Sequence, residues 1–365
     1  MVTVNLTNRC NQQCIYCEIG TSPSSGGKDI LTIDDILWII DQMAVNKIHK
    51  ISLCGGEPFL FDGIIDIVAY AGKKHIRCSI TTNGMTAFRL NETELKILKD
   101  CKTEINISVD SFQDDILAYT RGTAAALPNA LRSIQILKEM HIPVTILTVI
   151  TKYNFRDLFK FFATAYEHAI KQVLFQPVIY YSNYPDQSPV ENKSQLNVPV
   201  EEIDILLDEL RKILRFERNH KIKTNVYRIF PWISYYLKTA EAKNGKWFFD
   251  DVLKKFFCRE LYAIIDISYE GGIQPCGLTP ASVFIQENRD LGLMALWSQA
   301  TSKIKNDLIN RRYYDCCNGC CHHFSRNMLA SIFKHPIENR TTLFKILPLL
   351  FSRIGSGMVK KLFLH

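Results

Sequence analysis

Two kinds of apolar spacing alternate along the first half of the chain. Short, nearly continuous apolar runs predict strands over residues 2–7, 51–53, 76–82, 104–110, 144–150 and 173–178. Apolar positions at helical spacing predict helices over residues 32–46, 59–74, 92–100, 124–140 and 155–169. Strands that alternate with helices favour a parallel sheet covered by helices, and continuous apolar runs are typical of strands buried on both faces.

The pattern predicts an α/β fold, with a partial (β/α)6 barrel of the TIM type followed by smaller parts. A polar, turn-rich stretch begins near residue 180 and ends the alternation. We expect a partial barrel over residues 1–180, a helical connector over 181–254, a small α+β region over 255–325 and a basic amphipathic tail over 326–365.

Composition narrows the class of protein. A chain of 365 residues with 47% hydrophobic residues can bury a large core. Secreted proteins rich in disulfides are short and carry a signal peptide. This chain has 12 cysteines, but strand-forming residues begin at Val2 in place of a signal peptide. We therefore expect a reducing, cytoplasmic location, peripheral to a membrane at most, because no apolar run approaches the roughly 18–20 residues of a membrane span.

Three cysteines follow the first predicted strand in a polar loop. Cys10, Cys14 and Cys17 have the spacing C-x3-C-x2-C. Closed structural zinc sites normally take four protein ligands, whereas cubane iron–sulfur clusters are held by clustered thiolates. Three thiolates would leave one iron open to an outside molecule, which favours a catalytic cluster. A zinc knuckle is the alternative.

Further polar and glycine residues follow later strands of the predicted sheet. Ligands of parallel barrels bind at the carboxyl ends of the strands. Glycines let a backbone approach a ligand closely, and an arginine fork matches a carboxylate. The candidates at these ends are Gly55, Gly56, Glu57, Asn83, Ser108 and Arg121.

The cysteine loop with Tyr16 before its last cysteine, and the Gly-Gly-Glu sequence after the second strand, resemble the radical SAM superfamily. The resemblance implies that the open iron of a 4Fe–4S cluster binds S-adenosylmethionine. One electron from an external reductant of the flavodoxin or ferredoxin type then yields methionine and a 5′-deoxyadenosyl radical, which removes a hydrogen from the substrate. The residues implied to contact S-adenosylmethionine are Tyr16, Gly55, Gly56, Glu57, Asn83, Ser108 and Arg121.

A second group of cysteines surrounds a predicted hairpin. Cys258 precedes it, Gly271-Gly272 form its turn, and Cys276 ends its second strand. The sequence Cys-Cys-Asn-Gly-Cys-Cys follows, with cysteines at 316, 317, 320 and 321. Four thiolates can close a cubane completely, and a zinc ribbon is the alternative.

This second region resembles the SPASM/twitch extension of radical SAM enzymes, which implies an auxiliary 4Fe–4S cluster. The ligands favoured by the resemblance are Cys258, Cys276, Cys317 and Cys320, while Cys316 and Cys321 leave the choice within the doubled pairs open. The implied role is to accept an electron from a substrate radical; a structural role is the alternative.

The last 44 residues, 322–365, carry seven lysines and arginines against one acid, so they hold most of the net charge of +7. Apolar residues interleave with the basic ones. Such a stretch can lie on an anionic membrane surface or hold an acidic carrier, or it can pack on the barrel as a helix. Nucleic-acid binding is not predicted, because no recognition motif accompanies the charge.

The predicted function is a radical SAM oxidoreductase acting on a sugar, lipid-linked or other small-molecule substrate. Cys10 lies so near Met1 that we expect no leader-binding domain of the kind many peptide maturases carry. The alternatives are a peptide or protein maturase of the same superfamily, and a non-catalytic metal-binding scaffold. Gly55-Gly56-Glu57 beside a complete cysteine loop argues against the scaffold.

Overall fold

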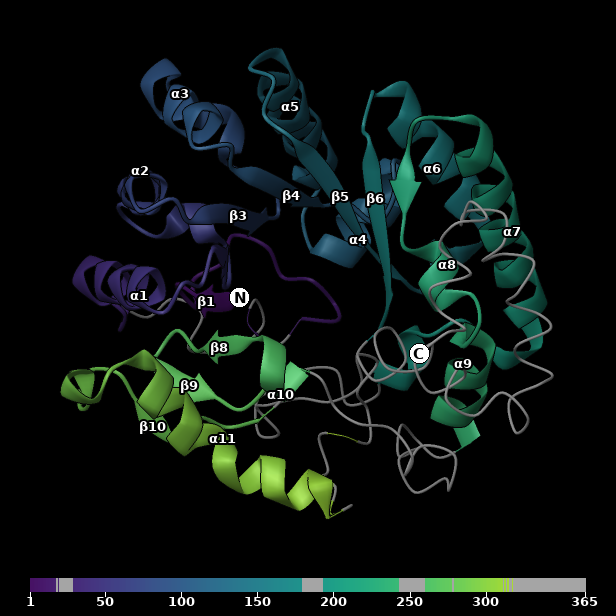
Figure 1. Cartoon of the computed structure of the whole chain (residues 1–365). Helices are drawn as coiled ribbons and strands as arrows, with labels where there is room; N and C mark the ends of the chain where they lie inside the picture. Colours follow the sequence, from purple (N-terminus) through teal and green to yellow (C-terminus); the bar gives the residue numbers. More distant parts are fainter. Residues whose placement is uncertain are drawn as a thin grey trace, which may run out of the picture.

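One ten-stranded sheet connects the described parts of the protein in a computed structural model (Figure 1). The described residues are 1–17, 19, 29–178, 193–242, 260–277, 279–310, 312, 314 and 317. The strand order is β10-β9-β8-β1-β2-β3-β4-β5-β6-β7. Neighbouring strands from β8 through β1 to β7 are parallel, whereas β9 and β10 are antiparallel to their neighbours.

The strands lie close to where the apolar runs placed them, which confirms the predicted parallel α/β sheet. Their bounds are β1 Val2–Asn5, β2 Lys50–Cys54, β3 Arg77–Thr82, β4 Glu104–Ser108, β5 Val144–Ile150, β6 Gln172–Pro177, β7 Lys223–Thr224, β8 Ile265–Ile267, β9 Gly272–Gln274 and β10 Val283–Phe284. Strand β8 pairs with β1, so the hairpin of the second cysteine group extends the barrel's own sheet.

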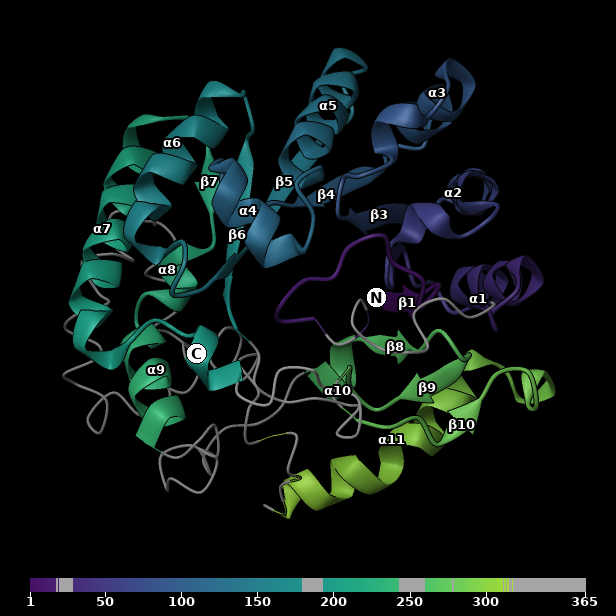
Figure 2. The ribbon, with the colours of Figure 1, turned by 180° about the vertical axis from the view of Figure 1, so that it is seen from behind.

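The helices of the barrel form an arc outside the strands in both views (Figures 1 and 2). Their bounds are α1 Ile33–Val45, α2 Ile64–Lys73, α3 Glu92–Asp100, α4 Asp114–Arg121, α5 Ala126–Glu139, α6 Leu158–Glu167 and α7 Ile203–Asn219. The later helices are α8 Val226–Ile229, α9 Ile233–Ala242, α10 Glu260–Ala263 and α11 Leu293–Ile309. Thr32 and Asp35 form a capping box at the start of α1, and Asn91 and Glu94 form another at α3.

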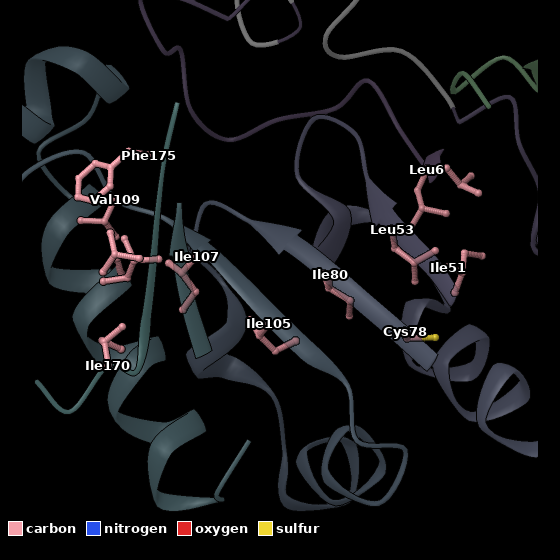
Figure 3. Close-up of a cluster of buried hydrophobic side chains, with 14 of the residues drawn as sticks. Leu6, Ile51, Leu53, Cys78, Ile80, Ile105, Ile107, Val109, Ile170 and Phe175 are labelled. Carbon is pink, nitrogen blue, oxygen red and sulfur yellow. The ribbon is translucent and has the colours of Figure 1, made fainter. Parts of the chain in front are cut away.

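The core lies between the sheet and these helices. Alternate residues of the strands are buried on the helix side, such as Ile51 and Leu53 of β2, and Figure 3 shows these side chains. The residues between them, such as Ser52 and Asn106, are half-buried and face the other side. The prediction of strands apolar on both faces is therefore wrong, because the inner face of the barrel is largely polar.

Three elements depart from the sequence prediction. The helix expected over residues 59–74 starts only at Ile64, because Gly63 adopts a left-handed conformation with φ of 85° after a short 3-10 turn at Pro58–Leu60. The first strand of the predicted hairpin begins only at Ile265, because α10 occupies Glu260–Ala263 just before it. Helix α4 was not predicted, because its eight residues are too few to show a helical period.

Several predictions concern residues outside the described part. They include Cys258, Cys316, Cys320, Cys321 and the tail over 326–365. Among the helices that are described, none has the length and apolar character to cross a lipid bilayer.

Candidate metal centre

The cysteine loop follows β1 and is fastened to the end of α4. The backbone amide of Gln13 donates to the carbonyl of Arg121 at 3.2 Å, and that of Ile15 donates to the carbonyl of Thr120 at 3.0 Å. Within the loop, the amide of Cys17 donates to the carbonyl of Cys14 at 3.0 Å. The loop therefore has a fixed backbone on the side of β4 and α4.

The Gly-Gly-Glu sequence fastens the other side of the loop. The amide of Gly56 donates to the carbonyl of Thr7 at 2.7 Å, and the amide of Glu57 donates to the carbonyl of Arg9 at 2.8 Å. A Cβ on Gly56 would lie 2.1 Å from the Arg9 carbonyl oxygen, and Gly55 has φ of 138°. The close approach that these glycines allow is an approach to the cysteine loop of the same chain.

Glu57 joins the ends of β2 and β3. Its buried carboxylate accepts hydrogen bonds from Thr82 Oγ1 at 2.7 Å, from the Asn83 amide at 2.8 Å and from the Phe59 amide at 3.2 Å. Burial raises the pKa of the Glu57 carboxyl, although these three donors work in the opposite direction. The structure thus gives Glu57 a positioning role, and its predicted contact with S-adenosylmethionine stays a prediction.

Asn83 links Glu57 to the cysteine loop by hydrogen bonds. Its side-chain nitrogen Nδ2 lies 2.7 Å from Asn11 Oδ1 and 3.8 Å from Cys10 Sγ, and donates to both. Its Oδ1 accepts from the Met85 amide at 2.8 Å, which fixes the orientation of the side-chain amide. Asn83 therefore lies at the cysteine loop, and its predicted contact with S-adenosylmethionine stays a prediction.

Asp110 lies at the centre of a buried polar network on the opposite side. Its Oδ2 accepts from Arg121 Nε at 2.8 Å and from the hydroxyl of Tyr16 at 2.5 Å, and its Oδ1 accepts from the Val149 amide at 2.9 Å. The Arg121 guanidinium lies 5.4 Å from the centre of the Tyr16 ring, and its Nη1 donates to Cys14 Sγ at 3.8 Å. Two predicted residues, Tyr16 and Arg121, thus meet at a carboxylate that the prediction had not named.

The charges of this network shift the proton affinities around it. Burial alone would lower the pKa of Arg121, but the adjacent Asp110 carboxylate holds it well above its usual range. Burial raises the pKa of the Cys14 thiol to about 12, against the opposing charge of Arg121. Burial also raises the pKa of Cys10. The free thiols of Cys10 and Cys14 therefore stay protonated at neutral pH, and coordination of a metal centre must release their protons.

The donor set fits an iron–sulfur cluster. Cluster thiolates are stabilised by hydrogen bonds to their sulfur atoms, and Asn83 and Arg121 supply such donors to Cys10 and Cys14. The Cys17 thiol lies close enough to perturb both of the other thiols electrostatically. Within the part of the chain that the structure describes, no three histidine, cysteine or acidic side chains gather closely enough to hold a single metal ion.

Only part of the second cysteine group can be placed. Cys276 follows β9 in a turn in which its amide donates to Thr279 Oγ1 at 3.1 Å. Cys317 is buried, with its amide donating to the carbonyl of Tyr314 at 2.9 Å. Since Cys258 and Cys320 lie outside the described residues, the auxiliary site stays a prediction.

Ser108 and Asp110 illustrate what the sequence showed and what it missed. Ser108 ends β4 at the predicted edge of the sheet and is half-buried. Asp110, two residues later, is fully buried. An acid directly after an apolar strand, with an arginine at position 121, was the available signal, because a buried carboxylate needs a partner.

Comparisons with known proteins show which superfamily and relatives the chain is similar to. The sequence model of the Radical SAM superfamily matches residues 4–165. The Fe-coproporphyrin III synthase of Methanosarcina barkeri is 27% identical over 218 residues, which are 58% of this chain and 52% of that protein. The chain spans about half the length of the curated relatives that it matches first.

Two solved structures share the fold. Native anSMEcpe with bound AdoMet has a TM-score of 0.63 and 15% identity, with 97% of this chain and 99% of that chain covered. SuiB of Streptococcus suis bound to its precursor peptide SuiA has a TM-score of 0.61 and 15% identity, with 83% and 66% covered. At these identities the likeness concerns the fold alone.

Proposed function

Through residues 4–165 the chain belongs to the radical SAM superfamily, and from this premise we propose that it cleaves S-adenosylmethionine reductively and removes a hydrogen atom from a substrate. The observation that carries the proposal is the three-cysteine loop, which lies between the buried hydrogen-bond networks of Glu57 and Asp110. These networks supply hydrogen-bond donors to Cys10 and Cys14. The Gly55-Gly56-Glu57 sequence beside the complete cysteine loop argues against a non-catalytic scaffold.

Cys10, Cys14 and Cys17 are the proposed ligands of the catalytic 4Fe–4S cluster. When bound there, the cluster supplies the electron that splits S-adenosylmethionine into methionine and a 5′-deoxyadenosyl radical. The chain itself holds the loop in place through Gly56 and Glu57. The proposed contacts to S-adenosylmethionine are those of Tyr16, Gly55, Gly56, Glu57, Asn83, Ser108 and Arg121.

A second 4Fe–4S cluster is proposed for Cys258, Cys276, Cys317 and Cys320, as acceptor of the electron that a substrate radical gives up. Strand β8 supports this proposal, because it pairs with β1 and so joins the hairpin before Cys276 to the strand that leads into the first cysteine loop. An external reductant of the flavodoxin or ferredoxin type completes the scheme, in a reducing, cytoplasmic setting. The tail remains a predicted contact for an anionic membrane surface or an acidic carrier.

The proposed substrate is a sugar, a lipid-linked molecule or another small molecule. The largely polar inner face of the barrel supports it, because hydroxyl and amide side chains such as Ser52 and Asn106 bind neutral polar groups. The second candidate is a peptide. It is favoured by the shared fold with SuiB, which was solved with its precursor peptide.

Product analysis tests the proposed reaction. Protein reconstituted with iron and sulfide without oxygen, then given dithionite and S-adenosylmethionine, should release 5′-deoxyadenosine and methionine. The Cys10→Ala/Cys14→Ala/Cys17→Ala variant should release neither. Wild-type protein that carries its cluster and forms no 5′-deoxyadenosine would overturn the proposal.

Iron and sulfide counting tests the two sites separately. We expect about eight irons per wild-type chain and about four in the triple alanine variant, because one cubane holds four irons. Zinc in place of iron at the second group would remove the electron-acceptor role and leave the first site standing.

A further inference from the structure

The ion pair between Asp110 and Arg121 lies beside the loop of Cys10, Cys14 and Cys17 and contacts Cys14. Both side chains are buried, with 0% and 6% of the residue surface exposed. Arg121 Nε lies 2.8 Å from Asp110 Oδ2, and Arg121 Nη1 lies 3.8 Å from Cys14 Sγ. One guanidinium therefore connects a buried carboxylate with a sulfur of the loop.

Asp110 is itself held from several directions, so it fixes the guanidinium rather than following it. The Tyr16 hydroxyl and the Val149 amide donate to its carboxylate, and Asn154 Nδ2 donates to its backbone carbonyl at 2.9 Å. The Tyr16 ring covers one side of the guanidinium. Strands β4 and β5 and the cysteine loop thus share one network, which leaves Arg121 little freedom to turn away from Cys14.

A fixed cation beside a cluster ligand has an electrostatic consequence. Reduction adds one negative charge to the cluster, and a positive charge nearby stabilises that reduced form. The effect is strong where water is excluded, and hydrogen bonds to ligand sulfurs act in the same direction. The carboxylate of Asp110 partly offsets the cation from the far side of the guanidinium.

We propose that Asp110 is a positioning residue that holds the Arg121 guanidinium against Cys14, and that this buried cation raises the reduction potential of the cluster bound by Cys10, Cys14 and Cys17. The inference rests on the proposed function, since it needs a cluster at that loop. It gives Arg121 a task in addition to the predicted contact with S-adenosylmethionine.

The test is a redox titration of the reconstituted protein, followed by electron paramagnetic resonance. The first cluster is recognised by the change in its spectrum when S-adenosylmethionine is added. Arg121→Gln should lower the ratio of reduced to oxidised cluster at least tenfold at a fixed applied potential, which corresponds to about 59 mV for a one-electron couple. Arg121→Lys, which keeps the charge, should stay closer to the wild type than Arg121→Gln.

Asp110→Asn supplies a shift of opposite sign. It keeps a side-chain oxygen that can accept from Arg121 Nε but removes the offsetting negative charge, so the ratio of reduced to oxidised cluster should rise. Asp110→Ala removes the acceptor as well, so its ratio should fall below that of Asp110→Asn, because the guanidinium is no longer held against Cys14. The matched control is Arg289→Gln, which breaks the ion pair with Asp35 on helix α1 and should leave the ratio unchanged. Iron content and thermal unfolding are measured on every variant, so that loss of the cluster is not mistaken for a shift.

The outcomes separate the two proposals. A wild type that binds no cluster at the loop contradicts the proposed function. A wild type with its cluster, and with Arg121→Gln and Arg121→Lys titrating at the wild-type potential, overturns the inference alone. Equal shifts in Arg121→Gln and Arg289→Gln also overturn it, because they would mark a general loss of structure.

Discussion

The cysteine loop is held on its two sides by different means. On the side of β2 and β3, the backbones of Gly56 and Glu57 bond directly to Thr7 and Arg9, and the Glu57 carboxylate bonds to neutral donors. On the side of β4 and α4, the Asp110 carboxylate is paired with the charge of Arg121. Both sides make backbone hydrogen bonds with the loop, but only the side of β4 and α4 adds a buried ion pair.

The comparison shows how the fold can fix the position of the loop and also set the charge beside one of its sulfur atoms. Backbone hydrogen bonds from Gly56 and Glu57 fix where the loop lies and bring no net charge to it. The Asp110–Arg121 pair also fixes the loop, and it brings a cation to one sulfur. Substitutions on the two sides should therefore differ in size and in their dependence on charge.

Removing the carboxylate of the ion pair should have the largest effect. In Asp110→Ala the guanidinium of Arg121 stays buried without its partner, and breaking a buried pair in this way costs about 3–5 kcal/mol. Denaturant unfolding of the metal-free protein measures the loss. Asp41→Ala, at a half-exposed carboxylate that bonds to Tyr70 and Lys74, should lose far less. Equal losses would contradict the difference drawn between the buried and exposed pairs.

A side chain at Gly56, where the backbone contacts Arg9, should give the next largest loss of stability. In Gly56→Ala the new Cβ would lie 2.1 Å from the Arg9 carbonyl oxygen, so the loop must shift, at a cost of about 3 kcal/mol. Cluster content after reconstitution should fall with stability. Gly277→Ala is the control, because its Cβ would meet Asp266 Oδ2 only at 3.9 Å. A stable Gly56→Ala protein with full iron content would show that the backbone contact does not place the loop.

Removing a single donor from Asp110 should have a smaller effect. Tyr16→Phe deletes one hydrogen bond to a charged group and leaves the ion pair with Arg121, so we expect a loss of about 1.5 kcal/mol in the free energy of unfolding. Tyr70→Phe, whose hydroxyl bonds to the half-exposed Asp41, is the control with the smaller loss. A Tyr16→Phe loss as large as that of Asp110→Ala would show that the hydroxyl, and not the cation, is the main partner.

The smallest expected effect is a change in how the stability of the protein depends on pH when Glu57 is replaced. Because burial raises the pKa of Glu57 in the folded state, its contribution to stability is largest below the ordinary carboxyl value and is lost as pH rises through the raised value. The stability of the wild type relative to Glu57→Gln should therefore fall as the pH rises above the ordinary carboxyl pKa, in unfolding experiments at several pH values.

Asp35 provides a control of opposite sign for that experiment. Burial would raise its pKa, but hydrogen bonds from Thr32 and Arg289 lower it overall. Its contribution is present above the ordinary carboxyl pKa and is lost as pH falls below it. Parallel pH trends for Glu57→Gln and Asp35→Asn would contradict the assignment for Glu57.

Local sequence signals predicted the frame of the barrel well. Helix α3 and strand β5 have the predicted bounds, because capping residues and continuous apolar runs act within a few positions. Gly55 and Gly56 were predicted to approach a ligand closely, and in the structure they approach the cysteine loop. The physical reason for the glycines is the carbonyl groups of Thr7 and Arg9, which are far away in the sequence and could not be identified from spacing.

The network around Asp110 could not be predicted in the same way. It joins Tyr16, Arg121 and the Val149 amide, which come from a loop, a short helix and a neighbouring strand. Such contacts depend on the register between β4 and β5 and on the position of α4, whose eight residues gave no clear period. Residues 108–111 showed only that polar groups end β4.

The central claim is that the loop of Cys10, Cys14 and Cys17 holds a cluster with one open iron. The most direct measurement is the electron paramagnetic resonance spectrum of the reduced protein before and after addition of S-adenosylmethionine, in a Cys276→Ala/Cys317→Ala variant that isolates the first site. We predict an iron–sulfur signal that changes shape when the compound binds. An unchanged spectrum, or a site filled by zinc, would contradict the claim.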